Sequence, residues 1–131
     1  MQCCLNARRC EEQTAKFMQN PALIRNRLKL NSLTANARAF LAVVSEFSSF
    51  YDYLWGYLVP KFDPKFDGKP IINNYESLKQ IPATTPLADF IAKEMKKRGF
   101  KFLGPTSVYA FLQSAGVVDD HLDACFCKGG R

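Results

Sequence analysis

The chain has little of what several common functions require. It contains a single histidine, His121, so no catalytic pair of histidines can be built from it. No apolar stretch is long enough to span a membrane, and the first ten residues, MQCCLNARRC, lack the apolar core of a signal peptide. There is no internal repeat, no low-complexity tract and no convincing alternating pattern of a half-buried strand. We therefore expect a cytoplasmic protein with no membrane partner and little β structure.

The cysteine count and the net charge indicate the state of the thiols and the kind of partner. The five cysteines are an odd number in a chain without an export signal, which favours reduced thiols or metal ligands over disulfides. The net charge of +6, from 18 Lys and Arg against 12 Asp and Glu, favours a polyanionic partner. With 131 residues and 47% hydrophobic content, residues 1–131 are expected to form a single domain with its own core.

Most of the chain shows helical periodicity. The segment EEQTAKFMQN predicts a short helix that ends at Asn20 and Pro21. Residues 22–47 predict a helix interrupted near IRNRLKLN, and SSFYDYLWGYL predicts an aromatic helix. The proline-spaced residues 59–85 predict an exposed connection with one short helix at 76–79. The expected fold class is all-α. Within residues 22–47, the side chains that recur at helical spacing are Leu23, Leu30, Leu33, Ala37, Phe40, Leu41 and Val44.

The stretch KKRGFKFLGPTSVYAFLQSAG, residues 96–116, joins two short helices tightly. Thr85 is a plausible N-cap and Pro86 suits the first position of a helix that ends at Gly99. Pro105 restarts a helix that Gly116 stops, so residues 86–115 are expected to form a helix–hairpin–helix. The side chains expected to face inward are Leu87, Phe90, Ile91 and Met95 in the first helix and Val108, Phe111, Leu112 and Ala115 in the second.

This hairpin could receive a phosphate. The first N–H groups of the second helix, near Gly104, Thr106 and Ser107, lack intrahelical partners and sit at the positive end of the helix dipole. Basic side chains nearby would add attraction to a nucleic-acid backbone. The alternative is an ordinary helical corner whose lysines are only solvated. The basic candidates are Lys96, Lys97, Arg98 and Lys101.

The tail VVDDHLDACFCKGGR carries candidate metal ligands. His121 and Cys125 are four residues apart, so on a helix they would share one face and could hold one metal ion. Cys127 follows two residues later. The alternative is a half-buried histidine beside a core cysteine. For Asp119 and Asp120 we expect a helix cap or a partner that orients the His121 ring.

Taken together, IRNRLKLNSLTANARAFL, FYDYLWGYL, KKRGFKFLGPTSVYAFLQSAGVVDDH and the final H-x3-C resemble, in this order, the DNA-3-methyladenine glycosylase I family. The similarity runs over residues 13–131. It implies a helical fold, a hairpin that grips duplex DNA, a structural zinc, and base-excision repair by hydrolysis of the N-glycosidic bond of alkylated adenine. On this resemblance, His121 and Cys125 match the two C-terminal zinc ligands, and the hairpin at Phe100 to Gly104 is the phosphate grip. The wider helix–hairpin–helix glycosylases carry a catalytic aspartate shortly after the second helix, but this family is not thought to depend on one there.

The start of the chain departs from the family pattern. Family members carry an N-terminal portion with a zinc-binding Cys and His, the aromatic residues of the base pocket, and a glutamate that contacts the base. Residues 1–12 do not match it, and no His, Trp or Tyr precedes Phe40. We therefore expect a domain that is incomplete at its N-terminus. The alternative to a working glycosylase is an inactive helix–hairpin–helix module that binds DNA. A third alternative is a small helical protein with no nucleic-acid role.

Three details follow from this departure. Cys3, Cys4 or Cys10 could complete the zinc site, although no pattern places them there. Aromatic residues further along the chain are expected to be core or interface residues, not a rebuilt base pocket. A monomer is expected, with self-association if apolar helix faces are left exposed. The aromatic residues concerned are Tyr51, Tyr53, Trp55 and Tyr57.

Overall fold

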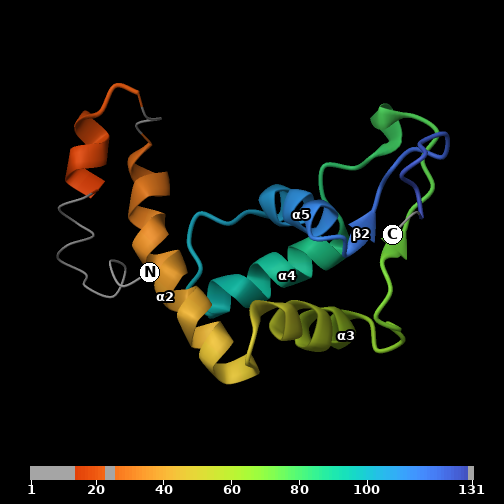
Figure 1. Cartoon of the computed structure of the whole chain (residues 1–131), viewed down its shortest axis with the longest axis horizontal. Coiled ribbons are helices and arrows are strands. Elements are labelled where there is room, and N and C mark those ends of the chain that lie inside the picture. The colour runs from red at the N-terminus through yellow and green to blue at the C-terminus, as the bar shows by residue number, and fades with distance from the viewer. Residues whose placement is uncertain (1–13, 23–25, 130–131) are drawn as a thin grey trace. The chain divides into compact units, whose positions relative to one another are not determined.

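The protein is mostly helical, which confirms the all-α expectation (Figure 1). The computed structural model describes residues 14–22 and 26–129. No helix of these two ranges is long and apolar enough to cross a membrane. After a short helix at residues 14–19, the elements are α2 (Arg27–Phe47), a π-helix (Asp52–Leu58), α3 (Val59–Phe62), β1 (Ile71–Ile72), a 3-10 helix (Leu78–Gln80), α4 (Pro86–Lys97), α5 (Pro105–Ser114) and β2 (Val118–Asp119).

The chain divides into two compact units. The first unit comprises residues 1–53 and 95–102, and the second unit comprises residues 54–94 and 103–131. Helix α4 begins in the second unit and ends in the first. The helix expected from EEQTAKFMQN is present at residues 14–19, while its expected first turn lies outside the described residues.

Helix α2 dominates the first unit, and its buried face is not the one expected. Its N-cap is Asn26, whose side chain accepts the Lys29 N–H at 3.1 Å. The buried side chains are Ser32, Ala39 and Val43, whereas the expected core residues Leu33 and Phe40 are 57% and 43% exposed. The buried face of α2 therefore carries small side chains, and the large apolar side chains of Leu33 and Phe40 lie on exposed faces of the helix. The remaining expected core residues also depart from the pattern: Leu41 is exposed, Leu30, Ala37 and Val44 are half-buried, and Leu23 lies outside the described residues.

Aromatic rings of the first unit cluster around the C-terminal part of α2. The ring centroids of Phe47 and Tyr53 lie 5.0 Å apart, and Phe50 lies 5.2 Å from Phe40 and 6.3 Å from Phe100. Tyr53 is fully buried, so its expected role as a core aromatic is confirmed. The aromatic helix is present, but Asp52–Leu58 are wound as a π-helix.

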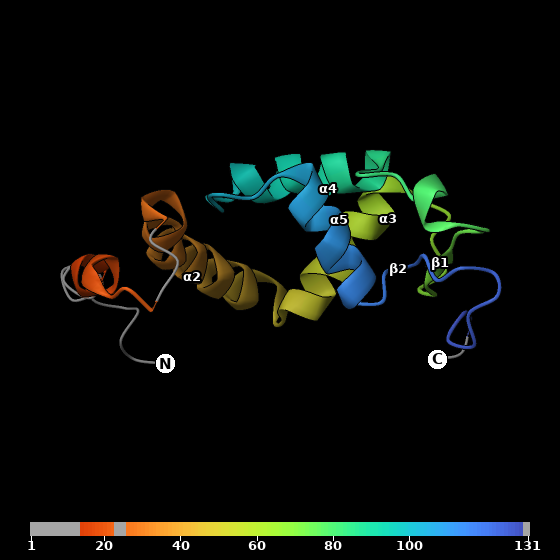
Figure 2. The same cartoon turned by 90° about the horizontal axis from the view of Figure 1, so that it is seen from above.

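In the second unit, side chains of α3 contact α4. The Lys61 Nζ lies 2.7 Å from a Glu94 carboxylate oxygen, and the rings of Phe62 and Phe90 are 5.5 Å apart. Strands β1 and β2 pair in parallel, with Ile71 opposite Val118, and lie next to each other in Figure 2. The ladder is two residues long, too short to leave an alternating pattern in the sequence.

The ends of α4 and α5 follow the local signals. The Ala88 N–H donates to the Thr85 hydroxyl at 3.3 Å, and Gly99 and Gly116 have φ of +93° and +73°. These angles suit glycine, which lacks the Cβ that penalises left-handed backbone. The expected caps and stops are thus confirmed.

The inward faces of these helices were predicted only in part. In α4, Leu87, Ile91 and Met95 are buried and Phe90 is half-buried. In α5, Val108 and Leu112 are buried as expected, but Phe111 and Ala115 are exposed. Tyr109 is buried in their place because its hydroxyl donates to the buried carboxylate of Asp120, at 2.5 Å.

Candidate nucleic-acid interface

The turn after α4 belongs to the first unit and reverses the chain within a few residues. The Gly99 N–H donates to the Lys96 carbonyl at 3.0 Å, and the Phe100 N–H donates to the Met95 carbonyl at 3.2 Å. Phe100 is buried, while Lys101 is exposed. The turn therefore anchors itself by an aromatic ring and presents a basic side chain to solvent.

The basic residues at the end of α4 lie in different surroundings. Lys96 and Lys97 are exposed. The Arg98 guanidinium instead forms a two-pronged ion pair with Glu46, in which its Nη2 lies 3.0 Å from Oε1, and it covers the rings of Phe47 and Tyr53 at 4.8 and 5.1 Å. The hydrogen bonds from Arg98 hold the pKa of the Glu46 carboxyl below its usual value. Arg98 thus joins the turn to α2.

The start of α5 belongs to the second unit. Gly104 is its N-cap and offers no side chain to the first N–H groups, while Pro105 occupies the first helical position. A Cβ built at Gly104 would meet no atom within 4 Å. Thr106 and Ser107 are exposed. The first turn of the helix therefore carries exposed residues and no capping side chain, as an anion site at a helix N-terminus requires.

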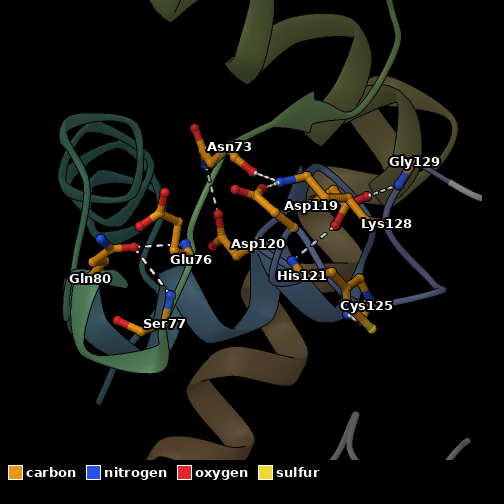
Figure 3. A network of polar contacts seen from close by, with 11 residues as sticks. Asn73, Glu76, Ser77, Gln80, Asp119, Asp120, His121, Cys125, Lys128 and Gly129 are labelled. Carbon is orange, nitrogen blue, oxygen red and sulfur yellow. Dashed lines mark hydrogen bonds and ion pairs between the residues drawn. The ribbon is translucent and has the colours of Figure 1, made fainter.

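A polar cluster shapes the C-terminal segment (Figure 3). One carboxylate oxygen of Asp119 accepts the His121 backbone N–H at 3.1 Å, and the other accepts the Gly129 N–H at 2.7 Å. These hydrogen bonds lower the pKa of Asp119, that from Gly129 having the larger effect. The Lys128 ammonium donates to the Asn73 carbonyl at 2.9 Å. The tail is thus tied to the segment that carries β1.

The expectation of a helix at His121 and Cys125 is wrong, because residues 120–129 form turns. The Asp119 carboxylate holds these turns through hydrogen bonds from the backbone N–H groups of His121 and Gly129. The two side chains nevertheless meet: His121 Nδ1 lies 3.7 Å from Cys125 Sγ. Tetrahedral zinc with usual Zn–N and Zn–S lengths places two such atoms about 3.6 Å apart. The pair therefore fits two positions of one zinc ion.

Further ligands are not found in the described part of the chain. Within residues 14–22 and 26–129, no three His, Cys, Asp or Glu side chains gather closely enough to hold a metal, so Cys127 does not join His121 and Cys125. The other candidates, Cys3, Cys4 and Cys10, lie outside these ranges.

Asp120 lies in a buried network. It is 8% exposed, and its carboxylate accepts hydrogen bonds from Tyr109 at 2.5 Å, from Gln113 at 2.7 Å and from Asn73 at 2.7 Å. Burial, and then the bond to Asp120, raise the pKa of Tyr109. Asp120 is therefore a structural acceptor joining α5 to the β1 segment. Neither aspartate caps a helix, and Asp119 contacts the His121 backbone, not its ring, so both expectations for this pair are wrong.

Sequence reasoning missed the partners of Asp120. Asn73 lies 47 residues away, and nothing in its local sequence distinguishes it from a loop asparagine. Tyr109 and Gln113 are four residues apart on α5, a spacing that places both on one face. That face could have been recognised only if a buried acceptor had been known.

An uncapped helix start that follows a basic turn offers the backbone N–H groups and positive charge that an anion such as a phosphate requires. The methyladenine glycosylase family model matches residues 5–128, so the chain belongs to this family. Its resemblance in sequence to that family is thereby confirmed.

Similar proteins are longer than this chain. It is 42% identical over 111 residues to DNA-3-methyladenine glycosylase of Haemophilus influenzae, covering 85% of the chain and 56% of the relative. It is 34% identical over 121 residues to DNA-3-methyladenine glycosylase 1 of Escherichia coli, covering 92% and 60%. The chain thus spans less than two thirds of the length of these relatives.

Solved structures agree in fold. A crystal structure of 3-methyladenine DNA glycosylase I matches with a TM-score of 0.77 and 42% identity, over 90% of this chain and 60% of that one. A variant of 3-methyladenine DNA glycosylase I in complex with 3-methyladenine matches with a TM-score of 0.75 and 31% identity, over 94% and 60%.

Proposed function

We propose that this protein binds duplex DNA through the segment from Lys97 to Ser107 and serves the removal of 3-methyladenine in base-excision repair. The observation that carries the proposal is the start of α5. Gly104 leaves the first N–H groups without a side-chain cap and leaves open space where a phosphate can approach. The relatives named as DNA-3-methyladenine glycosylases supply the reaction class.

The residues of the segment take different roles in this proposal. The backbone N–H groups of Thr106 and Ser107 donate hydrogen bonds to a phosphate oxygen, and the exposed Lys97 and Lys101 add charge attraction. Arg98 supports the turn through Glu46 and the aromatic rings and contributes positive charge from there. Because phosphate contacts position a protein without reading the base, this segment anchors the DNA and does not select the lesion.

Base removal needs a second set of groups. An alkylated purine is cationic and therefore a good leaving group, and it must be unstacked and held between aromatic rings. We assign no catalytic residue among those described. Asp120 accepts three hydrogen bonds in a buried network, Tyr53 is fully buried, and the ring centroids of Trp55 and Phe66 lie 5.6 Å apart.

A second candidate function is DNA binding without base release. Tyr53 is fully buried and the Trp55 ring packs against Phe66, with 5.6 Å between the ring centroids, so these two rings are engaged within the protein instead of facing a flipped base. In this case the 131-residue chain is a helix–hairpin–helix DNA-binding module.

Zinc is a further proposal. His121 and Cys125 would supply two of its ligands, as their 3.7 Å separation allows. A bound zinc would serve structure, by fixing the turns that follow β2. We also propose a cytoplasmic monomer without a membrane partner.

Two measurements test these functions with the same preparation. The first titrates the protein with undamaged duplex DNA at low and at moderate salt. Binding that weakens steeply with salt supports the backbone contact, and no binding at low salt overturns it. The second incubates the protein with methylated DNA and quantifies free 3-methyladenine by chromatography. Release above a no-protein control supports the glycosylase, while binding without release supports the DNA-binding module.

A further inference from the structure

Besides the ion pair between Glu46 and Arg98, a second side chain of α2 holds the turn after α4. The Asn36 Nδ2 donates to the Lys101 carbonyl at 3.0 Å, and the Lys101 N–H donates to Asn36 Oδ1 at 2.6 Å. One carboxamide therefore satisfies both backbone groups of a residue 65 positions away in the sequence. This pairing imitates a neighbouring strand, which would bond the same two groups.

The residues on either side show why the turn needs holding. Phe100 is buried within the first unit, and its ring centroid lies 6.3 Å from that of Phe50. Phe102 is half exposed and has φ of +55°, the left-handed conformation that residues other than glycine rarely adopt. Such strained backbone persists only where the surrounding structure imposes it. Lys101 is the link between the anchored ring and the strained residue, and Asn36 fixes that link.

We infer that Asn36 is a positioning residue, which holds the turn in the conformation that presents Lys101 to a DNA phosphate. It acts on the backbone of Lys101 and leaves the exposed ammonium group to the ligand. The carboxamide is neutral, so it orients the turn without neutralising the charge that attracts DNA. This inference rests on the proposed DNA contact, and its first test below does not depend on DNA.

The first test measures hydrogen exchange at the Lys101 amide in the full chain. Asn36→Ala removes the acceptor of this N–H and is expected to speed its exchange about tenfold or more, as for loss of a well-formed hydrogen bond. Asn31→Ala is the matched control, because Asn31 is an exposed asparagine on the same helix. We call the two hydrogen bonds between the Asn36 carboxamide and the Lys101 backbone the clamp. Equal exchange rates at Lys101 in the two variants would overturn the clamp, whether or not the protein binds DNA.

The second test asks whether the clamp acts through Lys101 on DNA. Affinity for undamaged duplex at low salt is measured for Asn36→Ala, Lys101→Ala and the double variant, with circular dichroism to confirm equal helix content. Lys101→Ala keeps the backbone bonds to Asn36 and removes only the charge. We expect Asn36→Ala to weaken binding about five- to tenfold, and much less once Lys101 is alanine, because coupled residues are not additive.

The outcomes separate the inference from the function on which it rests. Independent losses that multiply in the double variant, or an affinity of Asn36→Ala equal to that of Asn31→Ala, would overturn the positioning role. Wild-type protein that fails to bind DNA would overturn the proposed function, and the positioning role with it. The clamp itself would still be judged by the exchange rate at Lys101.

Discussion

Replacing Gly104 by glutamate is expected to abolish DNA binding without unfolding the protein. The Cβ of the new side chain would meet no atom within 4 Å, and φ at Gly104 is −99°, which any residue can adopt. A carboxylate at a helix N-terminus interacts favourably with the positive end of the helix dipole, so helix content is expected to be unchanged. What the substitution adds is a negative charge where the phosphate must approach.

The size of the effect follows from Coulomb's law. A unit charge about 6 Å from a phosphate repels it by about 0.7 kcal/mol in bulk water and by about 2.8 kcal/mol at the lower effective dielectric of a protein surface. A blocked N–H···phosphate bond adds about 1.5–3 kcal/mol. The sum of about 2–6 kcal/mol weakens binding by about 40-fold or more. Since backbone binding of DNA is typically micromolar or weaker, such a loss removes it from a low-salt titration.

The matched control is Gly56→Glu. Gly56 is an exposed glycine in the second unit, and a Cβ there also meets no atom within 4 Å. Both variants change the net charge from +6 to +5, because each adds one carboxylate. We expect fluorescence anisotropy with labelled duplex to show binding for Gly56→Glu and none for Gly104→Glu. Equal affinities of the two variants would refute the phosphate site at the start of α5.

The remaining predictions concern zinc, base release and stability. After dialysis, elemental analysis should show less than one zinc per chain, weakly bound, because His121 and Cys125 fill only two positions of a site that usually has four ligands. One tightly held zinc per chain would contradict this prediction. Cys3, Cys4 and Cys10 would then be the next residues to mutate. Because no described residue is assigned to base removal, methylated DNA incubated with the 131-residue chain alone should release no 3-methyladenine above the control, which is the outcome of the second candidate function. Backbone contacts do not offset the few kcal/mol that unstacking a base costs. Heat-sensitive release would favour the glycosylase and show that the chain forms a working pocket. Asp120→Ala should lower the free energy of unfolding by about 3 kcal/mol in urea titrations, because it leaves the donors of Asn73, Tyr109 and Gln113 without their acceptor. A loss below about 1 kcal/mol would argue against the network.

The beginnings and ends of helices could be predicted from sequence because they depend on neighbouring residues. Thr85 and Pro86 start α4, Gly99 and Gly116 supply the left-handed backbone after α4 and α5, and Gly104 with Pro105 starts α5. Capping and backbone conformation are local interactions, so a few consecutive letters contain them. The candidate anion site is made of the same local features, and this is why the sequence indicated it. Gly104→Glu tests this reasoning most directly.

The direction in which a helix faces was harder to predict. Leu33 and Phe40 on α2 and Phe111 on α5 have the spacing of core residues, yet each is exposed, while Ser32 and Tyr109 are buried. Periodicity shows that a helix has an apolar side, but not which side meets the rest of the molecule. For α5 the side was decided by the Tyr109 hydroxyl and the buried Asp120 carboxylate.

The polar contacts that organise the chain were decided only by the tertiary structure. Asn36 and Lys101 are 65 residues apart, and Asn73 and Asp120 are 47 apart. Turns tied by Asp119, not a helix, bring His121 to Cys125. In the sequence, these asparagines and aspartates look like any polar residue of a loop or helix surface. Their partners are set by how distant segments pack, and a hydrogen bond across such a distance leaves no trace in local periodicity or propensity.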